Sequence, residues 1–255
     1  MNNKIAILLL TQKSYIPEAN LIIDRLNKLK LPNYFQCYFA CKEINDFEIN
    51  SNWKKLNISL DCQTWGSEML SALNLIKEEY IFIFLDDFYP FRYFSSSKLK
   101  EKIDRSLKYN PSLIRINSNY NRRIFIRKKE KNIYEESYLH RYGTSLVLPI
   151  FKKNFLIEIL NKEDSPWIFE RYSTKRFNFK DHKFLFIKGF ELNFKVVNLV
   201  VRGKLLRTSI YRIPLNIRLN YLRNTKKFRK SLISEIRFHL KKLFHDMFMR
   251  YLPKI

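Results

Sequence analysis

An unbroken apolar run from Tyr80 to Leu85 limits most strongly what this chain can fold into. The run is rich in aromatic and β-branched residues, which is typical of a strand buried on both faces in the centre of a sheet. Asp86 and Asp87 follow it directly. Because ligands of open α/β sheets bind beyond the carboxyl ends of the strands, we expect a site at these two residues.

Two adjacent carboxylates repel each other, and this pair has two interpretations. A divalent cation, Mg²⁺ or Mn²⁺, would remove the repulsion, since hard oxygen ligands suit these ions and substrate phosphates can complete their coordination. Alternatively, the pair forms a capping turn, in which the Asp side chains accept hydrogen bonds from backbone N–H groups after the strand. The pair alone leaves both interpretations open.

Strand and helix patterns alternate through the first half of the chain. Strands are predicted over 4–10, 34–40, 80–85 and 113–116, and helices over 17–30, 67–77 (with Ser67 as N-cap) and 97–109. This alternation implies right-handed crossovers and a largely parallel sheet, hence an α/β sandwich. The first strand is followed by TQKSY rather than by a glycine-rich fingerprint, which disfavours a nicotinamide or flavin enzyme.

The second half carries two further candidate segments. We expect an exposed antiparallel hairpin among the charges of 118–135, a strand over 144–149 and a helix over 152–160. Another helix begins in SPWIFERY, where Ser165 can cap it and Pro166 suits its first position. Its Trp and Phe can simply pack, whereas Glu170 could face the carboxyl edge of the sheet as a base, with Asp164 next in line.

A strand over 194–201 ends at Arg202-Gly203-Lys204. Glycine after a strand permits close backbone approach, and the following lysine is a natural counter-charge for a phosphate. A short turn with a surface lysine would give the same pattern.

Composition and charge restrict the partners and the compartment. The formal charge of +24 predicts a negatively charged partner, which could be nucleic acid, an anionic membrane or a phosphorylated substrate. A low-GC coding bias would explain the charge without such a partner. The aromatic residues concentrate in apolar strands and no nucleic-acid-binding signature is present, so we expect no nucleic acid. Three cysteines (Cys37, Cys41 and Cys62) lack zinc-type spacing, and no apolar run reaches ~18 residues. We therefore expect a cytoplasmic protein.

Four motifs in order resemble one protein family. They are W-G-S-E before an amphipathic helix, Y-I-F-I-F-L-D-D-F, S-P-W-I-F-E and V-V-R-G-K. The chain resembles bacterial GT-A-fold glycosyltransferases, of a family-two-like branch found in surface-polysaccharide gene sets, over about residues 4–210. It differs in having adjacent acids rather than acids split by one residue, and in having Ile168 and Leu205 where Glu and Trp are expected.

The resemblance implies the activity and the roles of the site residues. It implies transfer of a sugar from a nucleotide-diphosphate donor to a glycan or lipid-linked glycan acceptor in lipopolysaccharide or capsule biosynthesis. Asp86 would contact the ribose or the metal, Asp87 would hold Mn²⁺ or Mg²⁺ on the diphosphate, and Lys204 would lie near the diphosphate. Thr11 completes the residues expected to bind the donor. Glu170 matches the acidic position that serves as base in inverting members.

The last forty residues form a separate unit in this interpretation, which divides the chain into a catalytic domain, 1–215, and a basic amphipathic helical tail, 216–255. The apolar stripe of the tail consists of Phe228, Leu232, Ile236, Leu240 and Phe244. The tail could lie on the anionic inner face of the cytoplasmic membrane, or dock this stripe on the domain.

Two alternatives to an enzyme stay open, a basic nucleic-acid-binding protein and a catalytically inactive GT-A scaffold. The two aspartates argue against the scaffold.

Overall fold

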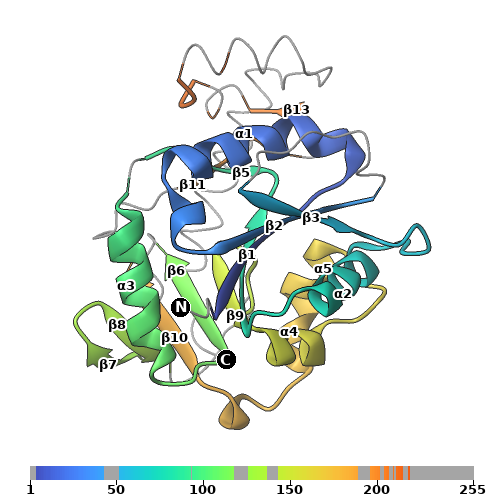
Figure 1. Ribbon diagram of the computed structural model, residues 1–255. Coiled ribbons are helices and arrows are strands. Elements are labelled where there is room, and N and C mark those ends of the chain that lie inside the picture. Colours follow the sequence, from blue (N-terminus) through green and yellow to red (C-terminus); the bar gives the residue numbers. More distant parts are fainter. Residues whose placement is uncertain are drawn as a thin grey trace.

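A nine-stranded sheet forms the centre of the molecule in the computed structural model (Figure 1). The structure describes residues 4–42, 52–92, 94–117, 126–136, 143–188, 196–201, 204–206, 209, 211–214 and 218. The strand order is β3-β2-β1-β4-β9-β6-β10-β8-β7. The strands of this sheet are β1 (Ile5–Leu10), β2 (Gln36–Cys41), β3 (Trp53–Asn57), β4 (Tyr80–Leu85), β6 (Leu113–Asn117), β7 (Ile126–Glu130), β8 (Ile133–Glu136), β9 (Pro149–Lys152) and β10 (Phe184–Lys188).

Seven of the nine strands run in one direction, and only β8 and β9 run against it. Parallel neighbours need crossover connections, and helices supply most of them. The helices are α1 (Ile16–Lys28), α2 (Trp65–Leu75), α3 (Ser96–Leu107), α4 (Lys153–Ile159) and α5 (Pro166–Tyr172), with 3-10 turns η1 (Lys13–Tyr15), η2 (Leu31–Asn33), η4 (Ser173–Lys175) and η5 (Phe179–Asp181). The expected α/β sandwich with a mostly parallel central sheet is confirmed.

Each face of the sheet is covered by its own helices, because side chains alternate between the faces along a strand. In β1, Ile5, Ile7 and Leu9 point into the core beneath α1 and α3. Ala6 and Leu8 point into the second core, beneath α2, α4 and α5. The central strands are therefore apolar on both sides, as the run in β4 predicts.

Two small sheets bring the later part of the chain back beside the end of β4. Strand β5 (Phe88–Pro90) pairs with β11 (Val196–Asn198), and β12 (Val200–Val201) pairs with β13 (Lys204–Leu205). The predicted strand over 194–201 is thus interrupted at Leu199, whose N–H donates to the Asp87 carbonyl over 2.6 Å.

Several predicted elements need correction. The strand predicted over 144–149 is wrong, because Leu148 has a left-handed backbone (φ 52°) and the strand begins only at Pro149. Helix α2 begins at Trp65 with Thr64 as N-cap, and Ser67 completes the capping box. The hairpin is present as β7 and β8, but β8 also pairs with β10, so of these two strands β7 alone lies at an edge of the sheet.

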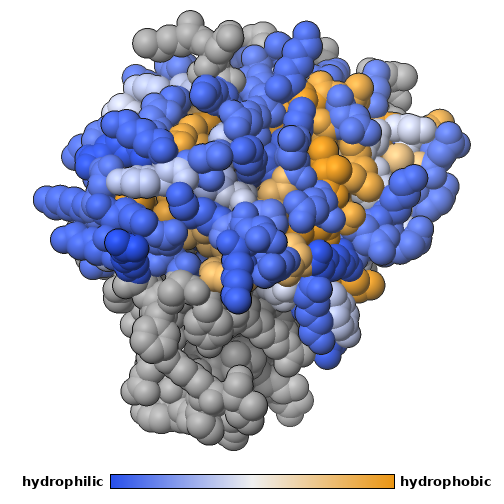
Figure 2. Space-filling model, turned by 90° about the horizontal axis from the view of Figure 1, so that it is seen from below, coloured by the Kyte–Doolittle hydropathy of each residue, from blue (hydrophilic) through white to orange (hydrophobic). Residues whose placement is uncertain are grey.

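The surface matches the strongly charged composition. Seen from below, the described surface is mostly hydrophilic, with a hydrophobic area right of centre (Figure 2). Within the described residues, no helix has the length and apolar character needed to cross a membrane. Apart from Arg218, the predicted tail 216–255 lies outside the described residues.

Candidate functional site

The two aspartates lie in the turn that follows β4, at the carboxyl edge of the sheet. Strand β4 pairs with β1, and Leu85 stands opposite Leu10, so Thr11 lies beside Asp86. The buried Thr11 hydroxyl donates to Asp86 Oδ2 over 2.5 Å, and Thr11 N donates to the Ala40 carbonyl over 3.0 Å. The ends of three parallel strands therefore fix the position of Asp86.

Asp87 lies in an environment that disfavours its charge. Burial, and next the charge of Asp86, raise the pKa of Asp87 to about 7, and Glu170 adds to this rise. Hydrogen bonds from its own backbone N–H and from the Asn198 side chain oppose the rise. Asp87 is therefore close enough to both Asp86 and Glu170 for their charges to affect its ionisation.

Tyr15 belongs to the same group, although the sequence did not single it out. Burial, followed by the charges of Asp86, Asp87 and Glu18, raises the pKa of the Tyr15 phenol. Tyr15 ends the 3-10 turn η1, which follows the carboxyl end of β1. The electrostatic influence of the carboxylates therefore reaches Tyr15, which directly precedes α1.

The end of β11 lies beside Asp87. Asn198 stands opposite Phe88 in the β11–β5 pair, and its side chain is hydrogen-bonded to Asp87. The backbone of Lys204 lies opposite Val201 in the next small sheet, while its side chain lies outside what the structure describes. Asn198 is a site residue that could not be found from the sequence, because nothing in a strand pattern marks one polar residue as facing Asp87.

Glu170 comes from α5, on the other side of the acid pair. Ser165 caps this helix, as predicted, by accepting from Ile168 N over 3.2 Å. One carboxylate oxygen of Glu170, Oε1, accepts from Ser145 Oγ (2.8 Å) and from Leu146 N (2.6 Å). The segment expected to be a strand thus instead supplies hydrogen-bond donors to Glu170.

The neighbours of Glu170 have different environments. Phe169 is fully buried, as packing predicts, but Trp167 is 69% exposed. Asp164, the second candidate for a base, is buried, and it accepts from Arg176 Nη2 over 2.7 Å. An ion-paired, buried carboxylate cannot reach an acceptor, so Asp164 is not a candidate base.

The acids fit a cation only together with a bound substrate. Within the described part of the chain, no group of three or more His, Cys, Asp or Glu side chains is arranged to hold a metal ion. Mg²⁺ usually binds one or two carboxylates together with substrate phosphates and waters. Asp86 and Asp87 match that ligand set, since a bound cation would offset both the burial and the repulsion by Asp86 that raise the pKa of Asp87.

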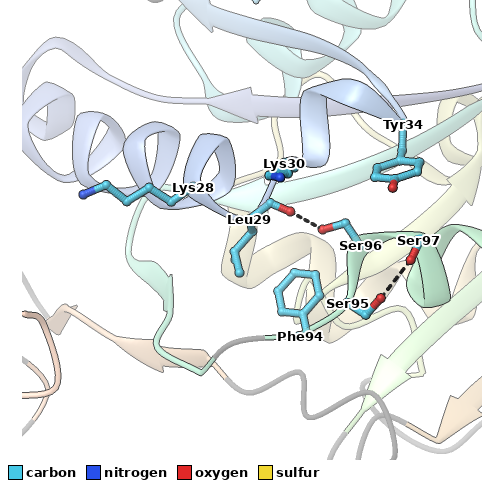
Figure 3. A pocket seen from close by; sticks show the side chains of 8 residues that line it. All are labelled: Lys28, Leu29, Lys30, Tyr34, Phe94, Ser95, Ser96 and Ser97. Carbon is cyan, nitrogen blue, oxygen red and sulfur yellow. Dashed lines mark hydrogen bonds between the residues drawn. The ribbon is translucent and has the colours of Figure 1, made fainter.

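A cavity of about 280 Å³ lies elsewhere, between the end of α1 and the start of α3 (Figure 3). Helix α1 begins near the acid pair, and 13 residues at ~1.5 Å each place its far end about 20 Å away. The cavity is therefore separate from the candidate site. Its lining residues are Lys28, Leu29, Lys30, Tyr34, Phe94, Ser95, Ser96 and Ser97.

No protein-family model matches the chain, and no curated protein matches its sequence. Among solved structures, S. aureus TarS 1-349 in complex with UDP-GlcNAc is similar at 14% identity and a TM-score of 0.48, over 72% of this chain and 56% of that chain. A UDP-glucose pyrophosphorylase complexed with UDP-glucose is similar at 14% identity and a TM-score of 0.46, over 76% and 92%. This chain thus spans little more than half the length of the TarS chain.

A third similar structure is a CMP:2-keto-3-deoxy-manno-octonic acid synthetase complexed with CTP, at 8% identity and a TM-score of 0.47, over 72% of this chain and 89% of that chain.

Proposed function

We propose that the protein is a glycosyltransferase that moves a sugar from a nucleotide-diphosphate donor to a hydroxyl group of a glycan or lipid-linked glycan. The observation that carries the proposal is the position of Asp87, which lies beside Asp86 in the turn after β4 and is close enough to Glu170 of α5 for the charge of Glu170 to raise its pKa. Carboxylates that come from two elements, the turn after β4 and helix α5, match a reaction that needs a donor-side and an acceptor-side carboxylate.

On the donor side, the acid pair requires positive charge before it can accept a diphosphate. Asp86 and Asp87 would hold Mn²⁺ or Mg²⁺, which when bound supplies charge stabilisation to the departing diphosphate. Thr11 orients Asp86, and Asn198 orients Asp87, so both acids are held in place by neutral hydrogen-bond partners. Lys204 is the proposed counter-charge for the diphosphate from the β13 side.

On the acceptor side, Glu170 is the proposed base of an inverting displacement. Its Oε1 is engaged by Ser145 and Leu146, which leaves Oε2 to take the proton of the acceptor hydroxyl. Hydrogen bonds to one oxygen fix the direction of the other, and a positioned carboxylate is what general-base catalysis needs. Inversion of the anomeric configuration follows, because the acceptor attacks from the face opposite the departing diphosphate.

The biological setting belongs to the proposal as well. A lipid-linked acceptor would place the enzyme at the inner face of the cytoplasmic membrane, in surface-polysaccharide biosynthesis. The basic tail 216–255, with eleven Lys or Arg residues against two acids, would suit attachment to anionic lipid there.

A thermal-shift panel tests the donor side. Nucleoside diphosphates with Mn²⁺ should raise the Tm of the wild-type protein, while the same nucleotides without the cation should have a much smaller effect. The Asp86→Asn/Asp87→Asn double variant should lose the cation-dependent shift, and Asp61→Asn, at an exposed acid in the loop between β3 and α2, should keep it. A full shift in the double variant would contradict the proposal.

A further inference from the structure

We propose that the N-terminal turn of α2 sets the position of Glu170, and that Gly66 is the residue that makes this possible. Gly66 is thus a positioning residue. The inference rests on the proposed function only in giving Glu170 a role as base, and the physical coupling between Gly66 and Glu170 can be tested without it.

The backbone of α2 approaches the loop before α5 more closely than any side chain would allow. Gly66 N donates to the Asp164 carbonyl over 2.8 Å. A Cβ atom at Gly66 would lie 2.1 Å from the Asn161 carbonyl oxygen and 2.8 Å from that of Lys162. Both obstacles are backbone atoms, so only glycine permits this contact. The Thr64 hydroxyl, which caps α2, also donates to the Lys162 carbonyl.

The same loop is tied to the far end of α5 by an ion pair. The buried Asp164 side chain accepts from Asn161 N (3.0 Å) and from Arg176 Nη2 (2.7 Å). Arg176 also donates to the Ile159 carbonyl over 2.9 Å. Because Asp164 precedes α5 and Arg176 follows it, the pair fixes both ends of the helix at once.

Side-chain packing connects the first turn of α2 to Phe169, the residue next to Glu170. Helix α5 has seven residues, too few to be stable without tertiary contacts. Its fully buried Phe169 lies 5.6 Å from the Trp65 ring and 6.1 Å from the Phe151 ring, between ring centroids. A shift of the α2 turn would therefore displace Phe169, and with it the oxygen of Glu170 that accepts from Leu146 N.

Amide hydrogen exchange at Leu146 reports the position of Glu170 independently of activity, because Leu146 N–H donates to Glu170 Oε1. Gly66→Ala should lower the protection of this amide roughly tenfold or more, as Glu170→Ala should, while β1 and β4 keep theirs. Asn74→Ala, at an exposed position of the same helix, is the matched control and should leave Leu146 unchanged. If Gly66→Ala does not fold, Arg176→Lys, which removes the bidentate contact, should give the same local loss.

The outcomes separate the inference from the proposed function. Unchanged Leu146 protection in a folded Gly66→Ala or Arg176→Lys variant would overturn the inference. Loss of protection together with a tenfold lower turnover and unchanged affinity for nucleoside diphosphate with Mn²⁺ supports both statements. Loss of protection with wild-type turnover supports the positioning of Glu170 by Gly66 and contradicts the assignment of Glu170 as base.

Discussion

The Thr11 hydroxyl donates to Asp86 Oδ2 over 2.5 Å and so joins the carboxyl ends of the central strands β1 and β4. The neighbouring Asp87 is held differently, by the Asn198 side chain and by its own backbone N–H. The two acids are adjacent in sequence but have different hydrogen-bond partners, so Asp86 can be tested by a change at Thr11 that leaves its carboxylate in place.

Thr11→Val keeps the shape of the side chain and removes the hydroxyl. Asp86 then loses a donor that orients it, so we expect several-fold weaker binding of nucleoside diphosphate with Mn²⁺. The free energy of unfolding should fall by about 1 kcal/mol. Calorimetric titration and urea denaturation measure the two effects. Thr174→Val, in the turn after α5, is the control and should keep the wild-type affinity for nucleoside diphosphate with Mn²⁺. Wild-type affinity in Thr11→Val as well would contradict the role of Thr11.

Glu170→Gln keeps the size of the side chain and its ability to accept from Leu146 N, but removes its basicity. Turnover should fall by roughly 10²-fold or more, while donor affinity barely changes. Steady-state kinetics and donor titration give the two quantities, and Glu163→Gln, at an exposed acid ahead of α5, is the control. If donor affinity falls together with turnover, Glu170 orients the donor. A product that retains the donor's anomeric configuration would refute the assignment of Glu170 as base.

The pKa of Asp87 predicts how stability depends on pH. Since its pKa is about 7 in the folded protein against an ordinary 3.8, the folded state keeps a proton between these values that the unfolded state has lost. The contribution of Asp87 to the free energy of unfolding is therefore fully present below about pH 4 and falls as pH rises to about 7. Asp87→Asn removes this loss and should stabilise the protein at pH 8 by about 1–3 kcal/mol.

Urea denaturation with a chelator, at pH 5 and pH 8, measures this effect. The gain from Asp87→Asn should be larger at pH 8 than at pH 5, and Asp61→Asn should give no such difference. An equal gain at both pH values would show that the charge of Asp87 is not disfavoured in the folded state.

The tail gives a prediction about membranes. If 216–255 attaches the enzyme to lipid, the full chain should co-sediment with anionic vesicles but not with neutral ones, and salt should release it. Removal of the tail should abolish sedimentation and leave activity on a soluble acceptor analogue unchanged. Equal binding to both vesicle types, or unfolding after the deletion, would instead favour a helix docked on the domain.

The central strands could be predicted because burial on both faces leaves a direct mark on the sequence. The runs in β1 and β4 are apolar throughout, and the helices beside them have the expected apolar spacing. The placement of Asp86 at the carboxyl edge follows from this pattern alone. The Ser165 cap of α5 was also predictable, because Ser-Pro is a local signal for a helix start.

Contacts between distant segments could not be predicted. Leu148 is in the left-handed region, so the apolar stretch before Pro149 does not form a strand and its backbone instead contacts Glu170. The choice of Thr64 over Ser67 as N-cap depends on a network in which Thr64 also reaches Lys162. Asn198 reaches Asp87 only because β11 pairs with β5, and neither of these three-residue strands has a pattern of its own.

The most direct test of the account is to identify the phosphorus-containing product by ³¹P NMR. The protein would be incubated with a panel of nucleotide sugars, Mn²⁺ and either water or a glycan acceptor. The wild-type protein should release a nucleoside diphosphate from at least one donor, and the Asp86→Asn/Asp87→Asn double variant should release none. The same release by the double variant would contradict the account, as would consumption of the nucleotide sugar only with added pyrophosphate to give a nucleoside triphosphate.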